Sequence, residues 1–219
     1  MKRIMITRPE DFVDISLEIP EIVTDVKYFT GENFVGEKID GYDAPIVLLT
    51  KKATIALKRV QKQLVEKGYG LKVYDGYRPK CAVEHFIRWV NTEENGKTKD
   101  FYYPGMTRLE VFQGGFIAKK SSHTRGSTVD LTVIKLDTGI EVDMGGSFDF
   151  FSQISYSDYD HLNIEQSKNR VQIRYLMRSE GFEPMQQEWW HFTLADEPYP
   201  ETYFDFCINA QINFEIMEK

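Results

Sequence analysis

The sequence predicts a single α+β domain with a mainly antiparallel sheet and flanking helices. Segments whose apolar residues recur with helical spacing are interspersed with short segments in which apolar and polar residues alternate as in strands. No internal repeat, low-complexity tract or linker rich in Pro, Gly or Ser divides the 219 residues. We therefore expect one domain over residues 1–219, with an N-terminal extension at 1–25 and a C-terminal tail at 207–219 that has no assigned role.

Three segments predict helices. Residues 51–67 carry apolar side chains on one face, with a possible N-cap at Thr50 and a possible stop at Gly68. A second helix is expected to begin at Pro79, because proline fits the first helical turn. The third predicted helix covers residues 164–180 and also carries an apolar stripe. These helices supply apolar faces that can cover a sheet.

Three further segments predict strands. Residues 71–75 alternate apolar and polar side chains and end at Gly76. Residues 129–134 alternate in the same way, so Asp130 lies on the face opposite the apolar side chains around it. Residues 188–193 are dense in aromatic side chains and are also expected to form a strand.

Composition excludes several classes of function. The net charge is −7 and no stripe of Lys and Arg occurs, so we expect no nucleic-acid partner. The sequence holds no apolar run of about 18 residues, which predicts no membrane span. Its start has no apolar stretch of the kind found in a secretory signal, so we expect a cytoplasmic protein. Cys81 and Cys207 lie far apart and neither has a second cysteine nearby, so any metal must use nitrogen and oxygen ligands.

The segment from Ser121 to Asp130 contains a histidine, a glycine and an aspartate. A turn at Gly126 can fold the side chains of His123 and Asp130 toward one point. An imidazole nitrogen and a carboxylate oxygen together suit a borderline cation such as Zn²⁺. The alternative is a histidine on a polar loop and an aspartate that caps a turn. Taken alone, this segment leaves both interpretations open.

The segment Glu188-Trp189-Trp190-His191 places a carboxylate and an imidazole beside two tryptophans. Burying polar groups in such surroundings is costly unless they have partners or a metal. If His191 is a third ligand, the site has an open fourth position, which is typical of catalytic zinc. Glu188 could then act as a general base if a bend brings its carboxylate close. The alternative is an aromatic core strand with a solvent-facing Glu188.

An arginine follows the first predicted strand, in the segment D-G-Y-R-P at 75–79. Arg78 lies between a strand end and a helix start, where side chains often line a cleft. Its guanidinium could stabilise an oxyanion or bind a substrate carboxylate. The alternative is an ordinary ion pair with a surface carboxylate.

Taken together, the three segments resemble one family. D-G-Y-R-P (75–79), S-x-H-x-x-G-x-x-x-D (121–130) and E-W-W-H (188–191) occur in the order found in the VanX-type D-alanyl-D-alanine dipeptidases of the zinc D,D-peptidase family M15. The similarity extends from about Val26 to Phe206 and includes V-K-Y-F-T, E-V-D-M-G-G-S-F-D-F-F and Y-P-E-T-Y-F-D-F. Each motif is moderately specific, and their shared order makes chance agreement very improbable.

The resemblance implies a metal centre and a mechanism. It implies a zinc D,D-peptidase or hedgehog-like fold with one Zn²⁺ per chain, held by His123, Asp130 and His191. Glu188 is implied as the base that takes a proton from zinc-bound water and passes it to the departing amine. Arg78 is implied to stabilise the oxyanion.

The resemblance also implies a substrate, the dipeptide D-Ala-D-Ala, and three residues that bind it. Asp149 and Tyr28 match the positions that recognise the free amino end, and Ser121 matches a position that helps to hold the dipeptide. A small zwitterion fits this set, because its ammonium needs a carboxylate. The two remaining histidines, His85 and His161, fall outside the motifs and are expected to be structural or exposed to solvent.

Two rival functions remain open at this point. One is a D,D-carboxypeptidase or endopeptidase that acts on peptidoglycan stem peptides, which would need an open pocket on the amino side. The other is a zinc module without catalytic activity, which would be expected to lack the base or the arginine. A homodimer is possible. Glycopeptide resistance, cell-wall turnover and D-alanine salvage all need the same reaction, so residues do not choose among them.

Overall fold

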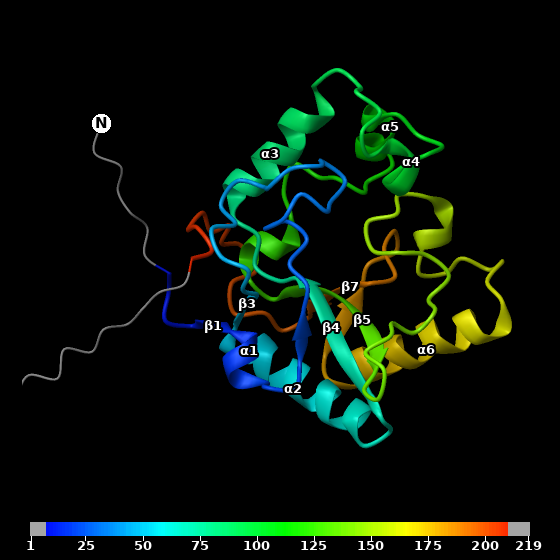
Figure 1. The fold of residues 1–219 in the computed structure, drawn as a ribbon. Helices are drawn as coiled ribbons and strands as arrows, with labels where there is room; N and C mark the ends of the chain where they lie inside the picture. Colours follow the sequence, from blue (N-terminus) through cyan, green and yellow to red (C-terminus); the bar gives the residue numbers. More distant parts are fainter. Residues whose placement is uncertain (1–7, 210–219) are drawn as a thin grey trace, which may run out of the picture.

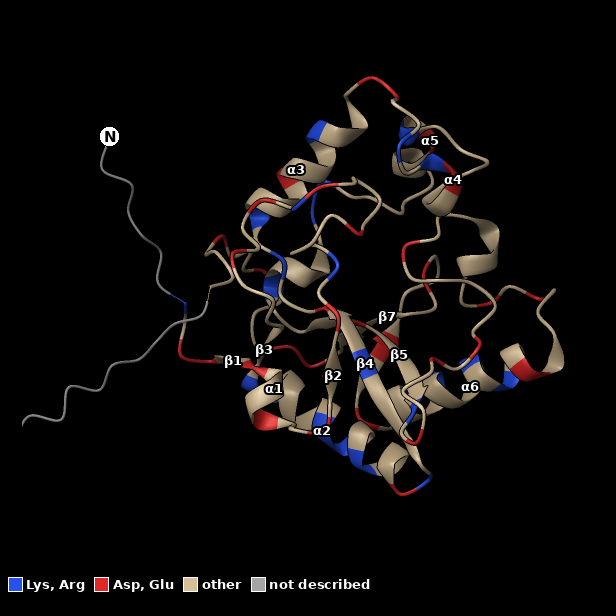
Figure 2. Ribbon diagram, in the orientation of Figure 1, with Lys and Arg blue, Asp and Glu red and all other residues tan. Residues whose placement is uncertain are grey.

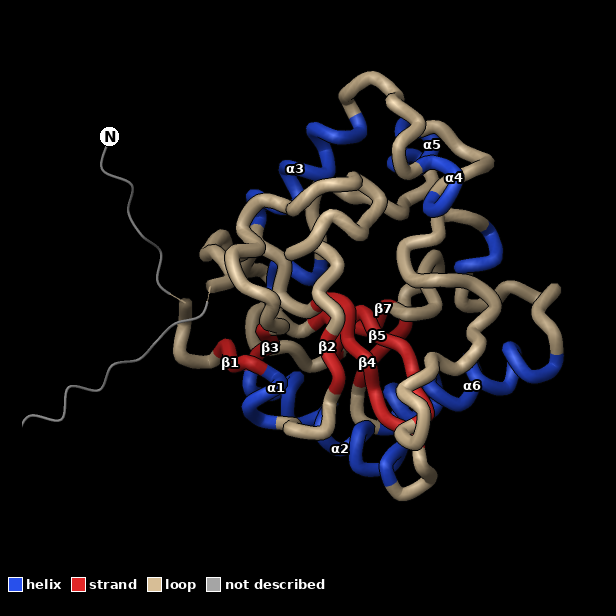
Figure 3. The backbone as a smooth tube through the Cα atoms, in the orientation of Figure 1, coloured by secondary structure: helices blue, strands red, loops and turns tan. Residues whose placement is uncertain are grey.

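The computed structural model describes residues 8–209, and a five-stranded sheet lies at its centre (Figures 1 and 3). The strands stand in the order β2-β4-β5-β7-β6. Their bounds are β2 Val23–Thr24, β4 Tyr69–Asp75, β5 Thr128–Lys135, β6 Phe182–Pro184 and β7 His191–Leu194. Strand β2 runs parallel to β4, and the other three neighbouring pairs are antiparallel. The predicted α+β class with a mainly antiparallel sheet is confirmed.

Helices flank this sheet on two sides. Their bounds are α1 Ile15–Glu18, α2 Lys51–Val65, α3 Lys80–Val90, α4 Lys99–Tyr102, α5 Arg108–Gln113 and α6 Ile164–Ser179. Figure 1 shows α2 and α6 at one end of the molecule and α3, α4 and α5 at the other, with the sheet between them. A separate antiparallel pair, β1 (Phe12–Asp14) with β3 (Leu48–Thr50), leads directly into α1 and α2.

Local sequence explains where the long helices begin and end. The Thr50 side chain accepts a hydrogen bond from the backbone N–H of Ala53 and caps α2. Gly68, with φ of 81°, turns the chain into β4, and Gly181, with φ of 88°, follows the end of α6. Helix α3 begins directly after Pro79. The three helices predicted from the sequence are therefore present.

One local expectation needs correction, and two short helices were not expected. Strand β7 begins at His191, whereas the aromatic pattern predicted a strand from Glu188. Residues 188–190 form a turn instead, because the backbone N–H of His191 donates to the carbonyl of Glu188 at 3.3 Å. The short helices α4 and α5 were not predicted, since four and six residues are too few to display a helical period.

The described ends of the chain take part in the fold. Residues 8–25, expected to be an extension, supply β1, α1 and β2, and Ile208 forms a bridge with Tyr42. Residues 1–7 and 210–219 lie outside the described residues, so the predicted tail is covered only up to 209. The domain bounds 1–219 stay a prediction.

Acidic and basic residues are mixed along the described helices. Figure 2 shows acidic and basic residues side by side on α3 and α6. Within residues 8–209, no helix has the length and the apolar character that crossing a membrane requires.

Figure 3 shows that much of the chain on the α3 side of the sheet is loop. Aromatic rings hold this part together. The ring of Phe34, for example, lies 4.9 Å from Phe86, 5.0 Å from Trp89 and 5.1 Å from Phe151 between centroids. Ring pairs at such spacing add to the stabilisation that burial of their apolar area provides.

Candidate active site

Sheet register brings two of the predicted metal ligands together. Asp130 on β5 stands directly opposite His191 on β7, so their side chains share one face of the sheet. His123 comes from the short 3₁₀ helix Ser122–Arg125, which the positive φ of Gly126 (84°) turns back into β5. An added side chain at Gly126 would collide with the ring of Phe12 at 2.1 Å, so only glycine fits this turn.

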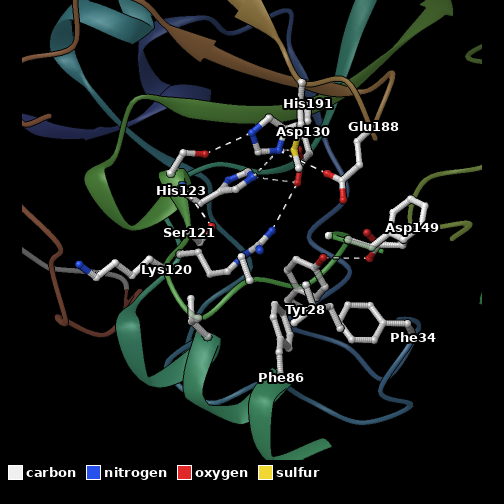
Figure 4. Close-up of a pocket in the computed structure, with 18 of the residues that line it drawn as sticks. Tyr28, Phe34, Phe86, Lys120, Ser121, His123, Asp130, Asp149, Glu188 and His191 are labelled. Carbon is white, nitrogen blue, oxygen red and sulfur yellow. Dashed lines mark hydrogen bonds and ion pairs between the residues drawn. The ribbon is translucent and has the colours of Figure 1, made fainter. Parts of the chain in front are cut away.

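The three side chains converge on one point (Figure 4). One ligand atom from each of His123, Asp130 and His191 lies within 4.8 Å of the others, and all three residues are buried. His123 Nε2 is 3.2 Å from His191 Nδ1 and 3.2 Å from Asp130 Oδ2. His191 Nδ1 is also 3.2 Å from Asp130 Oδ1.

Neighbouring acceptors orient the two imidazoles. His123 Nδ1 lies 2.7 Å from the carbonyl oxygen of Gly76, which can only accept, so Nδ1 donates and the Nε2 lone pair faces the other ligands. His191 Nε2 lies 3.2 Å from Ser122 Oγ, which leaves His191 Nδ1 to face Asp130. This outer support is the kind that fixes histidine ligands in metal sites.

The donor set fits a zinc ion. Asp130 Oδ1 is buried and has no hydrogen-bond partner among the described residues, although His191 Nδ1 lies 3.2 Å from it. If both imidazoles are neutral and oriented as described, this oxygen has no proton to accept and a cation would satisfy it. Two histidines and one aspartate leave a fourth position open, as in catalytic zinc sites.

The negative charge of the carboxylates in this cluster also favours a cation. Burial would raise the pKa of Asp130, but the neighbouring imidazoles of His123 and His191 lower it below its ordinary value. Burial would lower the pKa of His191, but the neighbouring carboxylates of Asp130 and Glu188 raise it to about 9. The carboxylates therefore stabilise positive charge at this point.

A turn places Glu188 beside the metal ligands. Glu188 lies three residues before His191, and the turn before β7 carries its Oε2 to 3.4 Å from His191 Nδ1. The backbone N–H of Trp189 donates to the carbonyl of Ser155 at 2.9 Å and anchors this turn. Glu188 is buried and lines the cavity. The solvent-facing alternative for Glu188 is therefore excluded in this structure.

Arg78 is fixed between carboxylates and aromatic rings. Its Nε and a terminal nitrogen each lie 2.9 Å from Asp75 Oδ2, and the terminal nitrogen is 3.4 Å from Asp130 Oδ2. Its guanidinium carbon lies 5.1 Å from the Tyr28 ring centre and 5.2 Å from that of Phe86. Burial opposes the charge, but the surrounding acidic groups raise the pKa of Arg78 above its ordinary value. Its partners are buried carboxylates rather than surface ones.

Asp149 is a further buried carboxyl group that lines the cavity. Its Oδ2 accepts a hydrogen bond from the Tyr28 hydroxyl at 2.9 Å. Asp149 has a φ of 58°, a conformation that non-glycine residues seldom adopt outside functional sites and turns. Burial, and after it the nearby carboxylates of Glu188 and Asp130, raise the pKa of Asp149 well above its usual value. A cation bound beside Asp149 would favour its ionised form and so lower this pKa again.

All eight predicted site residues line one cavity of about 310 Å³, at the small end of the usual range for ligand pockets. Ser121 lines it too, while its hydroxyl accepts a hydrogen bond from the backbone N–H of His123 at 3.3 Å. The structure thus brings every predicted site residue to one place. His85 lies on α3 and His161 in an exposed loop, both away from this cavity's lining.

Sequence reasoning missed two supporting residues. Ser122 contacts His191, and Asp75 holds Arg78 while accepting a hydrogen bond from the Tyr42 hydroxyl at 2.7 Å. Asp75 belongs to the D-G-Y-R-P segment, so its proximity to Arg78 was a usable signal. Nothing local distinguishes Ser122 from Ser121.

A buried His-Asp-His set with a carboxylate and an arginine beside it, in a small cavity on an α+β sheet, defines a metallopeptidase. The chain belongs to the D-Ala-D-Ala dipeptidase family of M15 zinc peptidases, whose family model matches residues 8–209. The family, the enzyme class and the zinc dependence predicted from the sequence are confirmed by this match.

Individual relatives agree. A D-alanyl-D-alanine dipeptidase of Enterococcus faecalis is 44% identical over 185 residues, covering 84% of this chain and 92% of the relative. One of Streptomyces coelicolor is 42% identical over 198 residues, covering 90% and 98%. Among solved structures, the LdcB LD-carboxypeptidase is similar with a TM-score of 0.43 and 16% identity, over 86% of this chain and 69% of that one.

Proposed function

We propose that this chain hydrolyses D-Ala-D-Ala to two molecules of D-alanine, with one Zn²⁺ held by His123, Asp130 and His191. The observation that carries the proposal is the convergence of these three ligand atoms within 4.8 Å, with Glu188 Oε2 3.4 Å from one of them. Relatives at 42–44% identity that are named D-alanyl-D-alanine dipeptidases support the substrate.

The mechanism follows from what each side chain can do. Zinc, when bound, supplies a Lewis acid that makes water a better nucleophile near neutral pH and polarises a carbonyl. Glu188 takes the proton of the attacking water at its carboxylate as the new C–O bond forms. It then gives a proton to the nitrogen of the departing D-alanine as the C–N bond breaks. Acid and base roles thus alternate on one carboxylate.

Arg78 and Asp149 act at different parts of the substrate. The Arg78 guanidinium, held by Asp75, donates to the scissile carbonyl oxygen and stabilises the negative charge that develops there. Asp149, with Tyr28, receives the free ammonium of the dipeptide, and Ser121 helps to hold it from the loop before the first ligand. The ammonium gives Asp149 the buried cationic partner that the free protein lacks among its described contacts.

Two rival functions are less well supported. A carboxypeptidase or endopeptidase for stem peptides needs room for a long acyl chain, whereas this cavity holds a buried carboxylate where that chain would enter. A zinc module without activity would not need Glu188 and Arg78 at the ligands. A cytoplasmic location and a homodimer stay predictions from the sequence.

Metal analysis coupled to a hydrolysis assay tests the proposal. We expect about one zinc per chain, release of D-alanine from D-Ala-D-Ala, loss of activity with a chelator and recovery when zinc is added back. The same preparation should hydrolyse a pentapeptide ending in D-Ala-D-Ala far more slowly. A preference for the pentapeptide would favour the carboxypeptidase, and zinc without hydrolysis would favour the inactive module.

A further inference from the structure

A second cavity lies next to the active-site cavity. It measures about 330 Å³, slightly more than the first. Among the residues that line either cavity, Phe116 and Phe151 are the two that line both. The far side of the second cavity is partly polar, with Ser152 and Gln153 among its lining residues.

The two shared phenylalanines contact each other. Their ring centroids are 5.2 Å apart at an interplanar angle of 37°. Phe151 is buried, its backbone N–H donates to the carbonyl of Tyr102 at 2.6 Å, and its ring also packs 5.1 Å from Phe34. Phe116 is half-buried and lies in a loop, 6.0 Å from the ring of Tyr156. Phe151 is therefore fixed in the core, whereas Phe116 lies in a loop where a substitution should leave the core intact.

The two segments that carry these rings, residues 114–116 and 149–153, each contribute to both cavities. Gly114 lines the second cavity, whereas its neighbour Gly115 lines the first. Likewise Asp149 lines the first cavity, and Ser152 lines the second. The aromatic contact thus stands where two segments separate two spaces, rather than at the surface of one of them.

The position of Asp149 indicates which end of a bound substrate would lie near Phe116 and Phe151. Asp149 precedes Phe151 by two residues and lies across the cavity from Lys120 (Figure 4). If Asp149 receives the ammonium of the dipeptide, any residue added at the amino end of the substrate must continue past Asp149. Phe151 and Ser152, which follow Asp149 in the chain, line the second cavity, so we infer that an extension past Asp149 would head toward that cavity and would meet the two rings first.

We propose that Phe116 and Phe151 form a wall that limits the substrate to a dipeptide by blocking extension at its amino end. This inference rests on the proposed function. It adds a steric limit to the charge selection by Asp149. A longer peptide loses its ammonium at Asp149 but keeps an amide N–H that can still donate there, so charge alone weakens such a peptide without excluding it.

Shortening the accessible half of the wall tests the proposal. The variants are Phe116→Ala and the milder Phe116→Leu, with Phe116→Tyr as the variant that keeps the wall. The matched control is Phe112→Ala, a half-buried phenylalanine four residues earlier that is not among the residues lining either cavity. The substrates are D-Ala-D-Ala, Gly-D-Ala-D-Ala extended at the amino end, and D-Ala-D-Ala-Gly extended at the carboxyl end.

The readout is kcat/KM for each extended peptide divided by kcat/KM for D-Ala-D-Ala. We expect Phe116→Ala to raise this ratio about tenfold or more for Gly-D-Ala-D-Ala, since removing a pocket wall changes selectivity on this scale. Phe116→Leu should raise the ratio less, and Phe116→Tyr should leave it unchanged. The ratio for D-Ala-D-Ala-Gly should not rise in any variant.

The outcomes separate this inference from the proposed function. If the wild type fails to hydrolyse D-Ala-D-Ala, the proposed function fails. If the wild type and the Phe116 variants cleave the dipeptide with unchanged ratios, only the wall is overturned. An equal rise in Phe112→Ala, or for the peptide extended at the carboxyl end, would show general loosening and would also overturn it.

Discussion

The active site joins two regions that are built in different ways. In the proposed metal-binding region, the hydrogen-bonded register of β5 with β7 places Asp130 opposite His191, and the short 3₁₀ helix and the turn that carry His123 and Glu188 adjoin these strands. In the proposed substrate-binding region, Tyr28, Asp149 and Phe116 come from loops that pack through aromatic rings. Reactive groups must be held closely, which a sheet does well, whereas substrate choice can be changed through loops without moving the metal ligands.

The largest effect is expected in the metal-binding region, from removal of the base. Glu188→Gln should lower kcat for D-Ala-D-Ala by about 10²–10⁴-fold, because an amide does not accept the proton. Zinc content should stay near one per chain, since Glu188 is not among the three ligands. Glu183→Gln on β6, an exposed glutamate, is the control and should keep full activity. Loss of zinc in Glu188→Gln would make Glu188 a ligand instead.

Loss of the oxyanion donor should have the next largest effect. Arg78→Ala is expected to lower kcat by about 10²–10³-fold, as removal of one such donor does in other hydrolases. Zinc should remain bound, although Arg78 contacts Asp130 at 3.4 Å. Arg88→Ala on the exposed side of α3 is a control for loss of an arginine. Steady-state kinetics with metal analysis measure both quantities, and an unchanged kcat in Arg78→Ala would remove it from the mechanism.

In the substrate-binding region, a smaller effect of a different kind is expected. Asp149→Asn removes the charge that would meet the ammonium, which is worth about 1.5–3 kcal/mol for a hydrogen bond to a charged group. We expect kcat/KM for D-Ala-D-Ala to fall about 10–100-fold, mainly through KM. A fall confined to kcat would show that Asp149 acts in the chemical step rather than in substrate binding, and would contradict the division between the two regions.

The turn that carries His123 should affect stability more than chemistry. Gly126→Ala forces a side chain into a positive φ and against the ring of Phe12, and should destabilise the fold by about 1–3 kcal/mol. Gly139→Ala is the matched control, since it has a positive φ (68°) but open space around it. Thermal unfolding compares the two. Equal losses would show that the contact with Phe12 adds nothing.

The smallest effect is expected where β2 leaves the sheet and leads toward Tyr28. Asp25 lies 2.8 Å from Lys72 and 3.0 Å from Lys27. Its half-buried position would raise its pKa, but these two lysines lower it below the ordinary 3.8. The stabilisation is thus present above pH 3.8 and is lost as pH falls through the lowered value.

Asp25→Asn should therefore reduce the acid dependence of stability below about pH 4. The free energy of unfolding, measured against pH with Asp137→Asn as a surface control, tests this. A wild-type slope that the substitution leaves unchanged would contradict the role of Asp25.

The sequence predicted site residues in both regions, but not all of the local structure around them. Helix signals at Thr50 and Gly68 are local, and the structure has them where they were expected. The aromatic run from Glu188 was misassigned, because a turn and a strand with the same apolar residues look alike until the hydrogen bonds form. The helices α4 and α5 were missed for want of length.

What the sequence determined by itself was the identity of the chemistry: the family, and the residue types in His123, Asp130, Glu188 and His191 that suit zinc and proton transfer. Only the tertiary structure decided which neighbours serve them. It brought Ser122 to His191 across 69 positions, Tyr28 to Asp149 across 121, and the ring of Phe116 to Phe151. Such contacts depend on sheet register and on loop packing between distant segments. No local pattern encodes them, because their energy arises only when both partners have been placed.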